Sequence, residues 1–356
     1  MTLTATQQKL PTSHAATTQA IAEGRRCRTR RFVLVTTALT ALVVVLAMLT
    51  LCLGETTVTF DKVLGALLGT DPSATFTVVR LRLPRALIAL AAGVAFGMAG
   101  RTFQVLLRNP LASPDIIGIT SGTTTAAVFA ILVLGWTGVG ASVFAVVSGL
   151  VVAAAIWALA NVQGRFSSRM ILIGIGTGAL FHALTSWLIL RANSHDVPEA
   201  MRWLTGSLTT SAGANALPLL ITVAALATAL VANERALRIL VLGRELAIGL
   251  GQPQRRTEVT LIALAVAIAA VATAATGPIT FVAFLAGPIA ASLIGANERS
   301  LLVPAGLVGA ALILLADLIG QNLLPFNYPV GVVTGLVGAP VLLAVIARAQ
   351  RKELTV

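Results

Sequence analysis

Long runs of apolar residues, separated by short polar segments, dominate this sequence of 356 residues. A helix needs about 20 mainly apolar residues to cross the hydrocarbon core of a bilayer. Strands of a membrane β-barrel would instead alternate apolar and polar residues over segments of about ten. The pattern therefore predicts an all-α, polytopic membrane protein with about ten transmembrane helices. The ten candidate runs are residues 32–53, 84–107, 118–134, 141–160, 170–190, 214–232, 259–276, 279–295, 301–319 and 329–347.

The charges give this topology an orientation. The net charge is +12, but its placement argues against nucleic-acid binding. Five arginines stand immediately before the first run, and by the positive-inside rule they keep the N-terminus in the cytoplasm. Ten spans then return the C-terminus to the same side, with 19 of the 25 Lys and Arg residues inside and 6 outside. The five arginines are Arg25, Arg26, Arg28, Arg30 and Arg31.

The chain divides into three parts. Residues 1–31 are polar and basic and are predicted to be a disordered cytoplasmic tail. Residues 32–348 contain all the apolar runs and form one transmembrane domain, and residues 349–356 are a short cytoplasmic tail. Cys27 and Cys52 fall at opposite ends of the first span, so neither a disulfide nor a metal site is expected.

Motifs for catalysis are absent from the sequence. It contains no phosphate-binding loop G-x-x-x-x-G-K-[ST], no H-E-x-x-H and no G-x-S-x-G. We therefore expect no catalytic residues, no cofactor and no enzymatic activity. An ionisable group within a span is by default a functional candidate, but for His182 a hydrogen bond to a backbone carbonyl is the favoured interpretation. Asp317 is similarly expected to bond neighbouring backbone or Asn322.

Three arginines lie on the predicted outer side, against the general trend. Arg80, Arg82 and Arg85 precede the second span. They could accept acidic groups of an external partner, since a guanidinium matches a carboxylate. They could equally anchor the span at lipid headgroups. The charges alone favour neither.

Two further segments stand out from the hydrophobic pattern. Residues 108–118 contain an Asn and two prolines within six residues, which predicts a folded elbow between spans two and three. Ser113 followed by Pro114 and Asp115 is typical of a helix N-cap that opens span three. Residues 233–258 are too charged to cross a membrane, yet keep leucines at helical spacing. They predict either an amphipathic helical hairpin on the cytoplasmic face or a helix resting on the bilayer surface.

Together these segments resemble the FecCD-type permease family, the membrane subunits of ATP-binding-cassette (ABC) importers for iron–siderophore complexes, haem and cobalamin. The resemblance runs from about the first span to the C-terminus. Each piece alone is weak, and their order and spacing make the signal specific. The pieces are RLPR (82–85), AAGVAFGMAG (91–100) with Gln104 and RNPLASPDIIGIT (108–120), MRWLTGSL (201–208), LGRELAIGLG (242–251), GPITFVAFLAGPIA (277–290), GAALILLAD (309–317) and YPVGVVTGLVGAP (328–340).

The resemblance implies partners and roles. It implies a dimer of permeases around the substrate path, a cytoplasmic ABC ATPase dimer, and an extracytoplasmic substrate-binding protein that docks on Arg82 and Arg85. The hairpin between spans six and seven would be the ATPase-coupling element, and the elbow would line or shape the pathway. The implied coupling residues are Gly243, Arg244, Glu245, Ala247, Leu250 and Gly251. The implied elbow and pathway residues are Gln104, Asn109, Pro110, Ser113, Pro114 and Asp115.

The sequence also departs from the family pattern. Gly287 to Ala291 replaces the frequent Pro-His-Ile-x-Arg, Gln321 replaces an arginine after Asp317, and Tyr328 replaces a glutamate. Arg101 replaces a small residue. Such an asymmetric docking surface favours pairing with a different permease, hence a heterodimer. The motif Ser-Pro-Asp-Ile-Ile-Gly (113–118) resembles ferric-siderophore members of the family more than cobalamin members, which favours a ferric siderophore as the substrate over cobalamin or haem.

Three other functional classes predict features that this sequence can be compared with. An ion-coupled secondary carrier would need carboxylates at mid-depth, and only Asp317 lies against the membrane. A membrane-embedded enzyme would need clustered His, Asp or Glu residues. A non-transporting scaffold is a third alternative. The sequence favours the permease subunit of an ABC importer that carries ferric-siderophore complexes by alternating access across the cell membrane.

Overall fold

The computed structural model describes residues 14–353 except for Glu55, Thr137, 161–165, Ser194, 209–215, 243–245, 247, 248, 250, 252 and 296–299. Every regular element in these residues is helical, as predicted. The elements are α1 (His14–Cys52), α2 (Phe60–Leu68), α3 (Pro72–Thr75), the π-helical turn η1 (Phe76–Arg82), α4 (Leu83–Leu107), α5 (Ile119–Leu132), α6 (Val139–Ala160), α7 (Phe166–Arg191), α8 (Val197–Leu204), α9 (Ala216–Ala232), α10 (Glu234–Leu242), α12 (Gln254–Thr276), α13 (Val282–Ile294), α14 (Leu302–Asn322) and α15 (Val330–Glu353).

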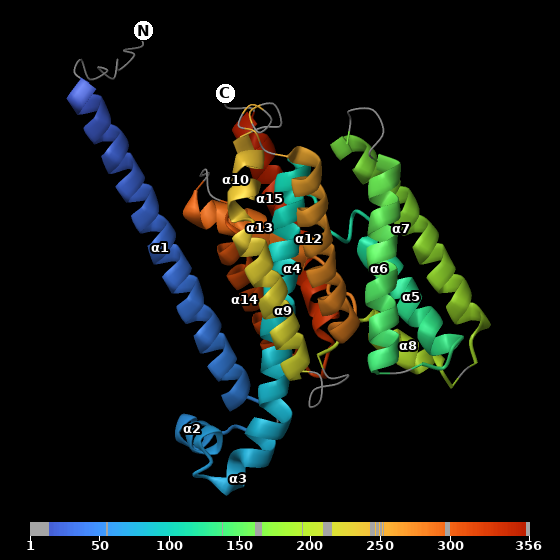
Figure 1. The fold of residues 1–356 in the computed structure, drawn as a ribbon. Coiled ribbons are helices and arrows are strands. Elements are labelled where there is room, and N and C mark those ends of the chain that lie inside the picture. The colour runs from blue at the N-terminus through green and yellow to red at the C-terminus, as the bar shows by residue number, and fades with distance from the viewer. Residues whose placement is uncertain are drawn as a thin grey trace, which may run out of the picture.

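The apolar helices confirm a polytopic membrane protein. Among the described residues six helices are long and apolar enough to cross a bilayer, and α9 with α10, bent by 52°, makes a seventh. Three shorter apolar helices, Ile119–Leu132, Val282–Ile294 and Val330–Leu342, coincide with predicted runs. Since these three are short, ten complete crossings stay a prediction. The start of α1, α10 and the end of α15 lie on one side, the upper one in Figure 1. We call it the inner side, following the predicted topology, and the opposite side the outer side.

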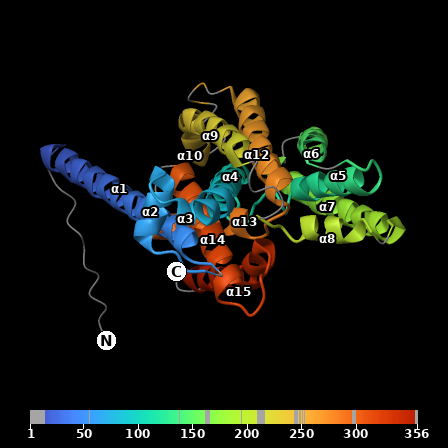
Figure 2. The same ribbon diagram turned by 90° about the horizontal axis from the view of Figure 1, so that it is seen from below.

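Helix α4 is the centre of the fold. It is surrounded by α9, α12, α13 and α14, and most of its residues are buried (Figure 2). Two of its glycines make this packing possible. A Cβ at Gly97 would overlap the carbonyl of Ala305 on α14, and one at Gly100 would overlap the carbonyl of Ala283 on α13. Small residues allow membrane helices to approach this closely.

Helix α1 is attached to the bundle only in part. Leu39 packs against Ala286, Ala305 and their neighbours on α13 and α14, whereas the inner half leans away from the body (Figures 1 and 2). Helix α1 begins at His14, within the segment that the sequence predicts to be a disordered tail. Apolar helix continues into this polar segment, and Arg31 holds it by donating to the carbonyl of Leu293 at 2.9 Å. Residues 1–13 lie outside the described residues.

Helices α5 to α8 form a group beside α12 (Figure 2). The hydroxyls of Thr125 on α5 and Thr185 on α7 join two of them through a buried 2.8 Å hydrogen bond. His182, also on α7, is exposed. The expected hydrogen bond from its imidazole to a backbone carbonyl is not among those of the described residues.

Candidate functional site

A polar crevice opens on the outer side, where four elements meet. It lies between the end of α1, η1, the start of α4 and the end of α14, and has a volume of about 490 Å³. Both arginines that were predicted to dock a partner are in its wall, together with the acid of α14. Its polar lining includes Thr50, Thr56, Thr77, Arg82, Arg85, Asp317, Gln321 and Asn322.

Arg85 and Asp317 form an ion pair in this crevice. The Arg85 Nη2 lies 2.7 Å from Oδ1 of Asp317, and its Nε donates to both carboxylate oxygens at 3.0 and 3.1 Å. The aspartate side chain is only 4% exposed, against 18% for the arginine. The pair therefore links α4 to α14. It also corrects the partner predicted for Asp317, because the Nδ2 of Asn322 donates to the carbonyl of Leu318 instead.

Arg82 closes the end of α1. Its Nη1 donates to the carbonyls of Leu51 and Cys52 at 2.8 and 3.0 Å, and its Nη2 donates to the carbonyl of Thr56 at 2.5 Å. The last carbonyls of a helix have no partner within the helix, so a cation here satisfies them and the negative end of the helix dipole. Of the three outer arginines Arg80 is the exposed one.

An aspartate caps α3, the short helix that leads into η1 and the crevice. Asp71 caps the short helix α3 by accepting from the amide and the hydroxyl of Ser73 at 2.9 and 2.6 Å. These hydrogen bonds hold the pKa of the Asp71 carboxyl below its usual value.

The predicted elbow exists, and its geometry differs in one respect from the prediction. Arg108 ends α4 with a positive φ of 48°, and Asn109 accepts from the amide of Leu111 at 2.9 Å through its side chain. The Ser113 hydroxyl accepts from the amide of Ile116 at 3.3 Å. It caps only a single turn, because α5 begins at Ile119 after Gly118 at φ 77°. The assignment of Ser113, Pro114 and Asp115 as the N-terminus of the third span is therefore wrong by one turn. Pro110 lies at the exposed tip.

Gln104 connects α4 to α13. It is 3% exposed, and its Nε2 donates to the carbonyl of Phe284 at 3.0 Å. Among the described residues its Oε1 has no partner. That oxygen lies against Gly287, where a Cβ would overlap it. The glycine that departs from the family pattern thus makes room for the amide.

The inner segment is described in part. Helix α10 turns off α9 and buries Leu237 and Leu240, which confirms an amphipathic start. Leu246 and Gly249 are exposed, and Gly251 has a φ of 75° before α12 begins. The other predicted coupling residues, Gly243, Arg244, Glu245, Ala247 and Leu250, lie outside the described residues.

Sequence reasoning missed a polar chain at the inner end of α4. Arg101 Nε donates to the carbonyl of Ser300 at 2.7 Å, and the Ser300 hydroxyl donates to Glu234 at 2.7 Å. Glu234 also pairs with Arg238 at 3.1 Å. The signal was Arg101 itself, a charge inside a span, which needs a partner at this depth.

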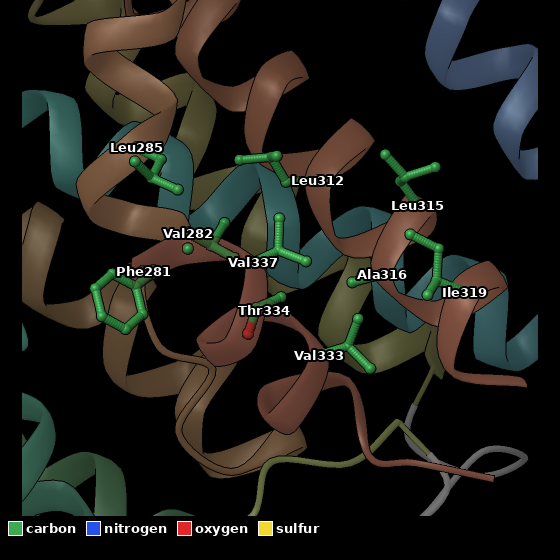
Figure 3. A pocket seen from close by; sticks show the side chains of 11 residues that line it. Phe281, Val282, Leu285, Leu312, Leu315, Ala316, Ile319, Val333, Thr334 and Val337 are labelled. Carbon is green, nitrogen blue, oxygen red and sulfur yellow. The ribbon is translucent and has the colours of Figure 1, made fainter. Parts of the chain in front are cut away.

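An apolar pocket between α13, α14 and α15 is too small for a chelate. Figure 3 shows it lined by side chains such as Phe281, Leu315 and Val337, and its volume is about 50 Å³. The Thr334 hydroxyl in its wall donates to the carbonyl of Gly331. This pocket is a packing gap.

Comparison with known proteins decides the family. The sequence model of the FecCD transport family matches residues 42–348. The chain belongs to the FecCD transport family. FepG of Escherichia coli K12, a ferric enterobactin transport system permease protein, is 37% identical over 84% of this chain and 91% of its own length. YfmE of Bacillus subtilis 168, an Fe(3+)-citrate import system permease protein, is 34% identical over 88% and 95%.

A solved structure supports the same assignment. It is an inward-facing conformation of a metal-chelate type ABC transporter, with a TM-score of 0.78 at 28% identity over 89% of this chain and 99% of that one. This FecCD protein therefore shares the helical architecture of a metal-chelate transporter. The ion pair, the residues that cap α1 and the elbow all lie within residues 42–348, which the family model matches.

Proposed function

We propose that this FecCD protein is the membrane permease subunit of an ABC importer that carries ferric-siderophore complexes into the cytoplasm by alternating access. The main support for this proposal is the family match over residues 42–348, together with relatives such as FepG, whose name specifies ferric enterobactin. A cobalamin importer is the second candidate, because the BtuC permease of Halobacterium salinarum is 31% identical over 77% of this chain.

The inner hairpin would couple transport to ATP. The absence of a phosphate-binding loop from the sequence fits a separate ATPase dimer that works on the segment after α10. We assign coupling to Gly243, Arg244, Glu245, Ala247, Leu250 and Gly251. With this segment in the cytoplasm, both ends of the chain are cytoplasmic and the protein lies in the cell membrane.

The outer crevice would receive the substrate-binding protein. A carboxylate of that protein could enter the crevice and compete with Asp317 for Arg85, or with the α1 carbonyls for Arg82. Docking would then loosen α14 or α1 from α4.

The substrate path would lie between two permeases. A siderophore complex is bulky and polar, and the described cavities within this chain do not match it, which supports a path built from two chains. Departures such as Gln321 and Tyr328 support a heterodimer. The iron would cross as cargo inside its chelator.

The test measures uptake of radiolabelled ferric siderophores in cells that lack this gene and in complemented cells. Replacing Arg244 and Glu245 by alanine should abolish uptake while the protein stays in the membrane. Uptake that resists ATP depletion and collapses with an ionophore would show a secondary carrier instead. Unlabelled cobalamin or haem that competes with uptake would identify the other substrate classes.

A further inference from the structure

An apolar groove lies on the membrane-facing surface between α9 and α14, with α4 as its floor. Its volume is about 300 Å³. Val303 is 43% and Val231 is 37% exposed, so the groove is open at the surface. The one hydroxyl in the wall, of Thr228, donates to the carbonyl of Ala224. The lining residues are Val94, Met98, Ala227, Thr228, Val231, Val303, Gly306 and Leu307.

The inner end of this groove is cationic. Arg101 lies one turn beyond Met98 on α4, and Ser300 lies two residues before the start of α14, close in sequence to Val303. Ser300 accepts from Arg101 through its carbonyl and donates to Glu234 through its hydroxyl, and Glu234 pairs with Arg238. This polar chain thus holds two arginines and one carboxylate, and the carboxylate contacts Arg238 directly and reaches Arg101 only through Ser300. The Arg238 side chain is 45% exposed.

The shape and the charges select the occupant. A helix of a second permease, about 10–12 Å across, is too wide to enter a hollow of about 300 Å³ and would lie across its rim. A single acyl chain can enter it. α1, the nearest helix that could cover this side, leans away on the inner half (Figure 1). A phosphate at the inner end would sit beside Arg238 at headgroup level.

We propose that this groove binds an anionic glycerophospholipid of the inner leaflet, with one acyl chain between α9 and α14 and the phosphate at Arg238 and Arg101. The lipid then contacts the polar chain that connects α4 to α10, directly before the inner hairpin. The headgroup of the bound lipid would therefore affect how firmly this polar chain holds α10 against α4.

The test is photolabelling of the full chain in vesicles of phosphatidylethanolamine with a minority of phosphatidylglycerol that carries a diazirine on one acyl chain. Adducts should map to the peptides containing residues 227–231 and 303–307. Thr228→Trp fills the groove and should remove most of this labelling. Ile221→Trp, on the same face of α9 but outside the groove, should leave it unchanged.

The headgroup is tested separately. Arg238→Gln should lower labelling by the phosphatidylglycerol probe about fivefold, the effect of one basic residue near an anionic surface. Labelling by the same probe built on phosphatidylcholine should not change. Adducts spread evenly along α9, or equal labelling of Thr228→Trp and wild type, would overturn the acyl site. Equal labelling by both probes in the wild type would overturn the anionic preference. A cysteine at Val231 that crosslinks to a second permease would also overturn the proposal.

Discussion

At the scale of single residues, charges inside the membrane are satisfied by partners far away in sequence. Arg85 and Asp317 are 232 residues apart, and Arg101 and Ser300 are 199 apart. The sequence flags each arginine as unusual for its position. It cannot name the partner, because that depends on how α4, α13 and α14 pack. Asp317 was therefore recognised as structural and given the wrong neighbour.

Asp317→Asn and Arg85→Gln should each destabilise the protein. The first change leaves a guanidinium without its counter-charge, and the second leaves the more deeply buried carboxylate without its own. Breaking a buried pair by removing one partner costs roughly 3–5 kcal/mol, and the partly exposed arginine lowers the expected loss toward the smaller figure. Thermal unfolding of the detergent-purified chain, followed by the loss of helical circular dichroism, measures this. Arg85→Met with Asp317→Leu should recover part of the loss. A double variant as unstable as both single changes combined would contradict an ion pair.

Gly287→Ala should also destabilise the protein, because the new methyl group meets the Gln104 amide. Overpacking of this kind costs about 1–3 kcal/mol. Adding Gln104→Ala removes the obstructing amide and should restore stability in the same unfolding assay. If Gly287→Ala is equally harmful with and without the glutamine, the two residues do not oppose each other.

At the scale of helices, the apolar pattern predicts length and position well and irregular ends poorly. Residues 84–107 were predicted, and α4 spans Leu83–Leu107. The start of α1 was misplaced, because polar helix beyond a span leaves no hydrophobic signal. The run predicted from residue 118 agrees with the start of α5 at Ile119, but Ser113 was assigned as its N-cap, since a single capped turn before a helix leaves no hydrophobic signal either. Backbone at positive φ in Phe281 and Leu301, which orients α13 and α14, has no sequence signature either.

Gly100→Ala should separate α4 from α13. Even one methyl group would overlap the Ala283 carbonyl, and backbone cannot move aside as a side chain can. We expect a loss of about 3 kcal/mol or more, at the upper end of overpacking, seen as a lower unfolding temperature. Gly176→Ala on α7 is the matched control, because no atom lies within 4 Å of the added group. Equal effects of the two changes would refute close packing at Gly100.

At the scale of the whole molecule, the spans and the two-sided arrangement follow from periodicity and charge, whereas the grooves and crevices arise from packing. The topology itself is open to a direct test. In a Cys52→Ser background, an impermeant maleimide should label Cys27 only after cells are permeabilised. Leu68→Cys, on the exposed face of α2 (70% exposed), should react in intact cells when Cys27 is also replaced. Labelling of Cys27 in intact cells, with Leu68→Cys labelled only after permeabilisation, would show that the chain has the opposite orientation in the membrane.

The ion pair between α4 and α14 has a consequence for biosynthesis. At roughly 5–20 residues per second, the ribosome needs on the order of ten seconds or more to reach Asp317 after Arg85. During that time the nascent chain carries an arginine that has no counter-charge. The glycines of α4 also lack the helices α13 and α14 that pack against them in the folded protein. A chain that stops before α14 should therefore be a substrate for membrane quality control, even though it contains most of the spans. The residues from Leu302 onward therefore decide whether α4 can stay in the bilayer.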